Sequence, residues 1–228
     1  CPVAVIGDIH GNSTLLRQLL DALPPEIPIL VLGDLCDRGP DTRGVYDLLI
    51  ARNAKGVRGN HDEWFIKWVT GQGFDSYALS FAMGGRTTLG SYGVEGRWPG
   101  AIEDQRFQVP AAHRKFAESL PIVLDLRVMG HEYWLIHAGV PNSVELPGLS
   151  AEQVVPYLVA EKPDVLLWPH TQPDDVLPLG RTVIMGHVCL RRPFDNGFTL
   201  GVDTGCSTIG GGRLTAVILP ERRFVTVG

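Results

Sequence analysis

The sequence predicts an α/β fold, because short apolar runs alternate along the chain with stretches of helical periodicity. The apolar runs are rich in Val, Ile and Leu, and several are followed by Gly and then Asp, Asn or His. Runs of this kind are typical of buried strands. In a sheet whose strands alternate with helices, ligands bind beyond the carboxyl ends of the strands. The polar residues that follow these runs are therefore candidates for a functional site.

Five segments fit the strand pattern. Two are closely alike, "VAVIGDIHG" at 3–11 and "PILVLGDLCDRG" at 28–39. Three looser versions follow, "KGVRGNHD" at 55–62, "YWLIHAG" at 133–139 and "TVIMGHV" at 182–188.

Four segments between the predicted strands have helical periodicity. The first begins at Asn12 or Ser13, either of which can cap it, and ends at Leu23 because Pro24 and Pro25 stop it. The other three span 42–52, 61–70 and 112–120.

Two segments break the alternation. Residues 71–100 are rich in Gly and dotted with aromatic residues, which predicts a cap-like insertion above the sheet, since loops of that length are usually functional. Residues 161–178 are rich in Pro, which predicts a second insertion. No linker is evident, so we predict a single domain over 1–228.

Composition excludes several classes of protein. The chain has 228 residues, of which 44% are hydrophobic and 20% charged, as in an ordinary soluble globular domain. The net charge of −5 argues against a nucleic-acid partner. No run approaches the roughly 18 apolar residues of a membrane span, so no membrane partner is expected. The four cysteines form no CxxC pair, which favours a reducing compartment and a cytoplasmic location.

Six polar residues follow the predicted strands and should gather at one edge of the sheet. They are Asp8, His10, Asp34, Asn60, His137 and His187. Carboxylates, imidazoles and an amide without a thiolate suit divalent ions such as Mn, Fe or Zn. Six ligands exceed the need of one tetrahedral ion, so we predict two divalent ions, with Mn favoured and Fe, Zn, Co or Ni as alternatives. A single Asp after a strand is more often a helix cap, but six such residues in order favour metal binding.

Two metal ions suit phosphoryl transfer, because they activate water near neutral pH and clamp the attacking and leaving oxygens. Arg38 and Arg58 lie close to proposed ligands, and guanidinium groups bind phosphate oxygens bidentately. Pairing of each Arg with a nearby carboxylate is the alternative.

Other phosphate chemistries lack their motifs. The chain has no GxxxxGK[ST] loop and no GxSxG turn. Cys36 and Cys206 are each followed by an Arg after six residues, whereas a cysteine phosphatase loop needs five.

The motifs "GDIHG", "GDLCDRG" and "GNHD", followed by "HAG" and a later "GH", resemble those of the phosphoprotein phosphatase family of metallophosphoesterases. The similarity includes bacterial Ser/Thr protein phosphatases and symmetrical dinucleoside tetraphosphatases, and it extends to "GGRTTLGSYG" and "DTG". It implies a calcineurin-like fold, a central β-sandwich flanked by helices.

The resemblance also implies roles for individual residues. Asp8 and His10 would bind the first metal, and Asp34 would bridge the two ions. Asn60, His137 and His187 would bind the second metal. His61 would be the general acid, held by Asp37, because a carboxylate raises the pKa of an imidazole and selects its tautomer. Arg38 and Arg58 would bind the substrate phosphate.

Two positions depart from the family pattern. An additional phosphate-binding Arg is usual in the segment before the last metal-binding His, but this chain has "LLWPHTQ" there. Either His170 or Arg181 is a candidate replacement. The usual "GHT" is "GHV" around His187.

Histidines and aromatic residues outside the motifs receive other predictions. We expect His113 and His131 on the surface, and Trp64, Phe65 and Trp68 in the core because they follow helical spacing. Tyr92 and Trp98 in the insertion are candidates for stacking on a nucleobase, although packing is the more ordinary role.

The sequence thus predicts a two-metal hydrolase of phosphoserine and phosphothreonine in proteins, acting through a hydroxide that bridges the metals. Asp37 in "GDLCDRG" favours this prediction, because it resembles the protein phosphatases, whereas bacterial tetraphosphatases often have Ala there. The alternative is a symmetrical dinucleoside tetraphosphatase that gives two nucleoside diphosphates, which the cap-like insertion favours. A third alternative is a non-catalytic phosphate-binding scaffold, against which the complete ligand set argues.

Overall fold

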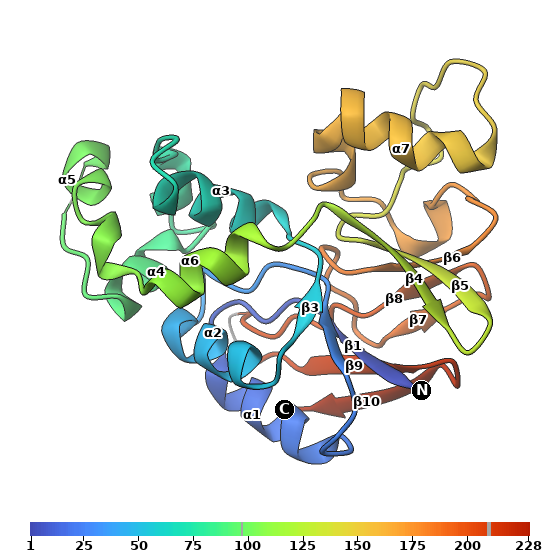
Figure 1. Ribbon diagram of the computed structural model, residues 1–228, viewed down its shortest axis with the longest axis horizontal. Helices are drawn as coiled ribbons and strands as arrows, with labels where there is room; N and C mark the ends of the chain where they lie inside the picture. Colours follow the sequence, from blue (N-terminus) through green and yellow to red (C-terminus); the bar gives the residue numbers. More distant parts are fainter. Residues whose placement is uncertain (97, 209–210) are drawn as a thin grey trace.

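The computed structural model of the protein describes residues 1–96, 98–208 and 211–228. Within them, two five-stranded sheets pack face to face, with helices on their outer sides (Figure 1). The β-sandwich implied by the family resemblance is therefore confirmed. The alternation of strands and helices did not by itself predict that the strands form two separate sheets.

The first sheet has the order β10-β9-β1-β2-β3. Its strands are β1 (Val3–Ile6), β2 (Ile29–Val31), β3 (Lys55–Gly56), β9 (Leu214–Leu219) and β10 (Arg223–Val227). The strands β1, β2 and β3 are parallel, whereas β9 runs antiparallel to both β1 and β10. The carboxyl ends of β1 and β2 therefore lie at the same edge of the sheet.

The second sheet has the order β4-β5-β6-β8-β7. Its strands are β4 (Val123–Val128), β5 (His131–Ile136), β6 (Thr182–Met185), β7 (Phe194–Asp195) and β8 (Thr199–Gly201). The strands β5, β6 and β8 are parallel, and β4 and β7 are antiparallel edges.

Side chains alternate between two cores along the central strands, as the two-residue period of a strand requires. Val5 of β1 and Val217 of β9 face the second sheet, where they meet Leu135 and Leu200. Ile6 of β1 and Ala216 opposite it on β9 face the helices instead, as do Ala4 and Ile218. Both faces of the first sheet are thus buried, which explains why β1 is wholly apolar and β9 is apolar except for the buried Thr215.

The helices cover the outer faces of the two sheets. They are α1 (Ser13–Ala22), α2 (Thr42–Ala51), α3 (Asn60–Val69), α4 (Gly85–Ser91), α5 (Pro99–Glu103), α6 (Ala111–Glu118) and α7 (Ala151–Glu161), with 3₁₀ turns η1 (Ser76–Leu79), η2 (Arg106–Gln108), η3 (Pro163–Leu166) and η4 (Pro173–Asp175). The four predicted helices correspond to α1, α2, α3 and α6. In Figure 1, α1 to α6 lie on the left and α7 covers the second sheet at the upper right.

Helix α1 illustrates how local sequence determines an element. The side chain of Asn12 accepts a hydrogen bond from the backbone N–H of Leu15 at 3.1 Å, which caps the helix as predicted. Leu16, Leu19 and Leu20 form its buried face. Leu23 is already extended, because a residue before Pro is disfavoured in helical geometry.

The Gly-rich segment 71–100 contains η1, α4 and the start of α5. Arg97, within it, lies outside the described residues. Leu89, Tyr92 and Val94 join the core beneath α2 and α3, so much of this segment is packed against the helices.

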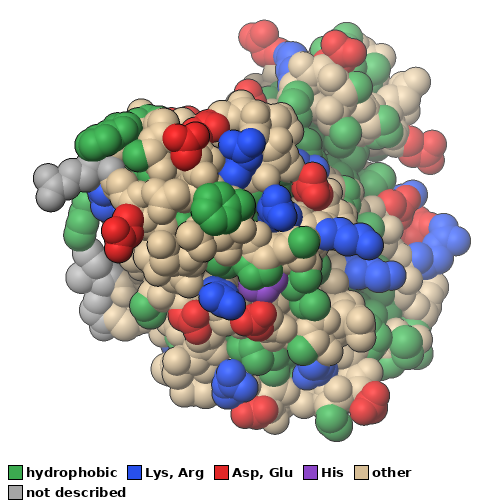
Figure 2. All heavy atoms as spheres, turned by 60° about the vertical axis from the view of Figure 1, so that its left-hand side comes forward, with side chains coloured by type: hydrophobic (Ala, Val, Ile, Leu, Met, Phe, Trp, Pro, Cys, Tyr) green, Lys and Arg blue, Asp and Glu red, His purple; other side chains and the backbone are tan. Residues whose placement is uncertain are grey.

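The surface carries no single-sign patch on the side shown in Figure 2. There, Lys and Arg side chains are interspersed with Asp and Glu across the described residues. None of the helices in the described part of the chain combines the length and the apolar character needed to cross a bilayer.

Candidate functional site

All of the predicted site residues except Arg58 lie where the chain leaves the two sheets, at one edge of the sandwich. They are Asp8 and His10 after β1; Asp34, Asp37 and Arg38 after β2; Asn60 and His61 at the start of α3; His137 after β5; and His187 after β6. The carboxyl ends of parallel strands share one edge, so residues far apart in the chain meet there.

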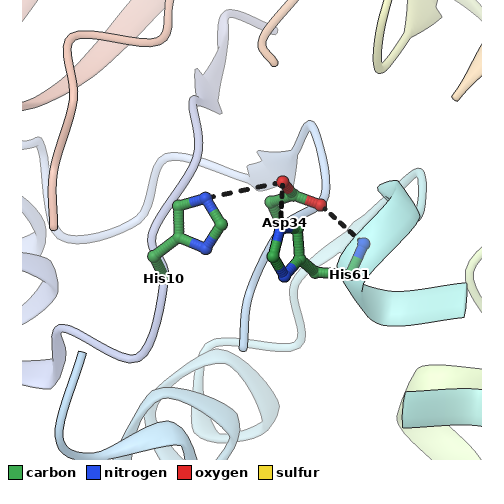
Figure 3. Close-up of side chains that lie close together, drawn as sticks. All are labelled: His10, Asp34 and His61. Atoms are coloured by element: carbon green, nitrogen blue, oxygen red, sulfur yellow. Dashed lines mark hydrogen bonds and ion pairs between the residues drawn. The ribbon is translucent and has the colours of Figure 1, made fainter. Parts of the chain in front are cut away.

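Asp34 lies at the middle of this cluster and is only 2% exposed. Its carboxylate is 3.5 Å from Nε2 of His10 and 3.5 Å from Nε2 of His137. Nε2 of His61 is 4.0 Å away, and the backbone N–H of His61 donates to Asp34 at 3.1 Å. Figure 3 shows His10 and His61 on two sides of Asp34.

Five site residues have a left-handed backbone, which is uncommon for residues other than Gly. The φ angles are 45° for His10, 50° for Asp34, 68° for Asp37, 65° for Arg38 and 64° for His187. Such a conformation costs roughly 1–3 kcal/mol and persists only where the surroundings hold it, most often at functional sites. The loops are therefore shaped to present these side chains.

Backbone carbonyls select the tautomer of three histidines. Nδ1 of His10 lies 2.9 Å from the carbonyl of Cys36, and Nδ1 of His137 lies 2.8 Å from that of Leu32. Nε2 of His187 lies 3.2 Å from the carbonyl of Trp168. Because a carbonyl can only accept, we assign the proton to each of these nitrogens, which leaves the opposite nitrogen with a free electron pair.

The free electron pair of His10 faces the guanidinium of Arg38, whereas those of His137 and His187 face other electron-pair donors. Nε2 of His137 is 3.1 Å from Nδ1 of His187 and 3.1 Å from Oδ1 of Asn60. No proton can satisfy all three atoms when the histidines are neutral, so the arrangement fits a cation. Two groups of side chains can hold a metal ion, His10 with Asp34 and His61, and Asp34 with His137 and His187; within each group the ligand atoms lie within 4.8 Å of one another.

The electrostatics of the cluster also fit bound cations. Burial lowers the pKa of His10 to about 3 and that of His187 to about 4, so both imidazoles are neutral at physiological pH, as metal ligands must be. Burial raises the pKa of Asp8 well above its ordinary value, and the nearby carboxylates of Asp203 and Asp34 raise it further. A divalent ion would relieve this repulsion among buried carboxylates.

Asp8 belongs to the cluster through His187. Its carboxylate accepts the backbone N–H of His187 at 3.1 Å and is 2% exposed. The group that forms around His10 contains His61 in its place. A role for Asp8 as a ligand of the first metal remains a prediction.

His61 and Asp37 form a hydrogen-bonded pair in the interior. Nδ1 of His61 lies 2.7 Å from Oδ2 of Asp37, and the hydroxyl of Thr88 donates to Oδ1 of Asp37 at 2.7 Å. Burial alone would lower the pKa of His61, but Asp34 and the bond to Asp37 raise it above its ordinary value. The pair can therefore hold a proton on Nε2 of His61.

The two predicted phosphate-binding arginines differ in their surroundings. Nη1 of Arg38 lies 2.8 Å from Nε2 of His10, and Nη2 lies 3.3 Å from Nε2 of His61, so this guanidinium lies at the cluster. Arg58 instead pairs with Glu63 at 2.9 Å and donates to the carbonyl of Leu120 at 2.7 Å. In this arrangement Arg58 points to α3 and to the segment that follows α6, and its phosphate-binding role remains a prediction.

The two candidate replacements for the missing Arg lie in different places. The ring of His170 is exposed and its centroid is 4.8 Å from that of His187, beside the cluster. Arg181 pairs with Asp125 at 2.6 Å and lies over the ring of Trp134, at the start of β6 and so away from the carboxyl ends of the strands.

Three supporting residues had no predicted role. Asp62 accepts the backbone N–H groups of Leu35 and Gly59, which ties the Asp34 loop to α3. Asp62 is the third residue of α3 and accepts the N–H of Gly59, the residue before the helix, which is half of a capping box; an acidic residue at this position is the signal that could have identified it. Thr88 holds Asp37, and Ser207 donates to the carbonyl of His10 at 2.8 Å.

One surface prediction is wrong. His113 is 2% exposed, because Nδ1 bonds to the hydroxyl of Tyr92 at 2.9 Å and Nε2 to Asp47 at 2.9 Å. Hydrogen bonds on both ring nitrogens allow a histidine to be buried, and the local sequence does not predict such bonds. Tyr92, at 4% exposed, is a packing residue here, and Trp64, Phe65 and Trp68 are buried as predicted.

Comparisons with known proteins identify the family of the chain. Residues 1–199 match the family described as calcineurin-like phosphoesterase. A "Bis(5'-nucleosyl)-tetraphosphatase PrpE [asymmetrical]" of Halalkalibacterium halodurans is 26% identical over 98% of this chain and 92% of its own length. "Serine/threonine-protein phosphatase 1" of Salmonella typhimurium is 31% identical over 62% of this chain and 60% of its own.

A solved structure described as a putative diadenosine tetraphosphatase shares the fold. It has a TM-score of 0.62 and 23% sequence identity, over 99% of this chain and 92% of that one. The match of the family to most of the chain, together with the relatives, shows that this protein is a hydrolase of phosphoric esters and belongs to the calcineurin-like phosphoesterase family.

Proposed function

We propose that the protein hydrolyses dinucleoside tetraphosphates with the help of two divalent metal ions. The chemistry is supported by the cluster around Asp34, where neutral imidazoles and buried carboxylates converge. The choice of substrate is supported by the extent of the alignments, since the tetraphosphatase relative aligns with 98% of this chain and the Salmonella protein phosphatase with 62%.

In this proposal the ligand set is the predicted one. His10 and Asp8 would hold one ion, Asn60, His137 and His187 would hold the other, and Asp34 would contribute to both. Bound divalent ions of this kind polarise phosphoryl oxygens and make water acidic enough to react near neutral pH. Mn is the metal we favour, because the oxygen and nitrogen donors include no thiolate.

The remaining residues orient the substrate and move a proton. Arg38 binds oxygens of the phosphoryl group under attack, since its guanidinium already lies against His10 and His61. His61 donates the proton on Nε2 to the leaving oxygen, while Asp37 keeps Nδ1 protonated and the ring oriented.

Hydrolysis of phosphoserine and phosphothreonine in proteins is the second candidate. The His61–Asp37 pair favours it, because a serine or threonine alkoxide is a strong base and needs a proton as it leaves. A nucleotide phosphate is a much weaker base and depends less on a general acid.

Parallel turnover assays test the choice of substrate. Mn-loaded protein is given diadenosine tetraphosphate or a phosphothreonine peptide, with Asp34→Asn as the blank. We expect a higher kcat/KM for the dinucleotide. ADP as the sole product would mean symmetrical cleavage, and AMP with ATP asymmetrical cleavage. A higher kcat/KM for the peptide would replace the proposal by the second candidate, and equal rates in wild type and blank would refute this site.

A further inference from the structure

A cavity of about 530 Å³ adjoins the site on the side of Arg38. Its lining includes Arg38, Leu79, Phe81, Arg86, Ser207 and Thr208. The volume lies within the range of about 300–1,000 Å³ that is usual for small-molecule sites. Of this lining, the site described above uses Arg38 and, as a support for His10, Ser207, so the other lining residues have no assigned role.

Both walls of the cavity are tied to the catalytic cluster. The wall formed by 79–87 is held where the backbone N–H of Arg38 donates to the carbonyl of Gly84 at 3.2 Å. A Cβ atom on Gly84 would lie 2.5 Å from the nitrogen of Arg38, so only Gly permits this approach. The opposite wall is held by the hydrogen bond from Ser207 to the carbonyl of His10 at 2.8 Å. A molecule bound in the cavity would thus have a defined position relative to the metal ligands.

The lining matches a phosphate chain that ends in an aromatic base. Arg38 contacts the cluster, and Arg86 offers a second, exposed guanidinium in the same cavity. Within the described residues, the side chain of Arg86 takes part in no hydrogen bond or ion pair, which leaves its charge available to an anion. Phe81 is 89% exposed, so the face of its ring is available for stacking.

We propose that this cavity is the subsite for the nucleoside end of the substrate, with Phe81 stacking on the base and Arg86 binding phosphate beyond the group under attack. The inference rests on the proposed function, because only a nucleotide substrate supplies both a base and further phosphates. Nucleobases stack on aromatic side chains whatever their sequence, and guanidinium groups bind phosphate oxygens bidentately.

A comparison of turnover on a large and a small substrate tests the subsite. The variants are Phe81→Ala and Arg86→Gln, and the measured quantity is the kcat/KM for diadenosine tetraphosphate divided by that for p-nitrophenyl phosphate. We expect each variant to lower this ratio about 10-fold, since p-nitrophenyl phosphate has neither base nor further phosphate. Phe198→Ala, which removes another exposed Phe at 70% exposure, and Arg223→Gln, at the start of β10, are the matched controls and should leave the ratio unchanged.

The outcomes separate the subsite from the proposed function. If wild type hydrolyses the dinucleotide and the ratio is unchanged in both variants, the subsite is wrong while the proposed function stands. If wild type hydrolyses only the peptide, the proposed function fails, and equilibrium dialysis of ADP decides the subsite by itself. Weaker ADP binding by Phe81→Ala and Arg86→Gln than by wild type would support the subsite, and equal binding would overturn it. A fall in peptide turnover alone would assign the cavity to a peptide and overturn the inference.

Discussion

At the scale of single residues, Asp34 is the side chain on which most of the site depends. It contacts His10, His61 and His137 and lies in both groups that can hold a metal. Asp34→Asn removes the negative charge and one oxygen ligand while preserving the volume of the side chain. Loss of a residue that only supports a ligand commonly costs about 10–100-fold in affinity or activity, so we expect a larger loss here.

Metal analysis of dialysed protein and a turnover assay check this expectation. Asp34→Asn should lose bound Mn and more than about 100-fold in kcat/KM. Asp21→Asn, an exposed position on α1, is the matched control. Unchanged metal content in Asp34→Asn would contradict the role of the residue.

Asp37→Asn should change how activity depends on pH. Asp37 raises the pKa of His61, and a general acid must be protonated to act. Without that carboxylate the pKa of His61 falls, so the loss of activity on the alkaline side of the pH profile should move to lower pH. The profile of kcat/KM measures the shift, with Asp47→Asn at the distant His113 as the control. A basic limb that stays in place would argue against His61 as the acid.

The sequence predicted which residues converge, but not how each is held. Strand-end positions of Asp34, His137 and His187 could be anticipated, because carboxyl ends of parallel strands meet at one edge. The partner of Arg58 could not, since its choice between Glu63 and a phosphate depends on side-chain geometry. The burial of His113 could not be predicted for the same reason, since its two hydrogen-bonding partners lie 21 and 66 residues away.

At the scale of elements, the hairpin between β4 and β5 carries a conformation that its sequence does not suit. Met129 and Gly130 form a two-residue turn with φ angles of 48° and 87°. Positive φ at both residues is the property of a type I′ turn, which prefers Asn-Gly. Met129 is 63% exposed, so its side chain contributes little packing that a substitution would lose.

Met129→Asn should therefore raise the free energy of unfolding by about 0.5–1 kcal/mol, since Asn adopts the left-handed conformation more readily. Urea denaturation measures the change. Met129→Ala keeps a Cβ atom without the tolerance of Asn and should give no comparable gain. Equal stability of the two variants would show that turn geometry is not limiting.

Elements with clear local signals were predicted well and the others were not. Asn12 and the Pro24–Pro25 pair mark both ends of α1 within one residue. Helix α7 was not predicted, because it contains Pro156 and Pro ordinarily breaks a helix. The pairing of β9 with β1 joins the two ends of the chain, and no local pattern contains information on such a partner.

At the scale of the whole molecule, the proposed metal ligands join the two halves of the sandwich. Asp8 and Asp34 follow strands of the first sheet, whereas His137 and His187 follow strands of the second. Ions held between them would stabilise the folded state, which alone brings the ligands together. An ion present at 1,000 times its Kd contributes about 4 kcal/mol.

Removal of metal with EDTA should therefore lower the Tm of the wild type. Asp34→Asn should show a smaller difference between metal-loaded and EDTA-treated samples, because its metal affinity is already reduced. Differential scanning calorimetry measures both. The same Tm for wild type with and without EDTA would contradict a metal that bridges the sheets.

The position of β1 between β2 and β9 has a consequence for the order of events during synthesis. Val3 pairs with Leu219, and Asp8 binds a backbone N–H that is 179 residues further along. At about 5–20 residues per second, roughly 10–40 s separate the emergence of the two strands from the ribosome. For that time one edge of an apolar strand has no partner, and the ligand set is incomplete. The proposed ligand set would therefore be completed only after the strands of the second sheet have been synthesised, so metal binding by the full set would be a late event.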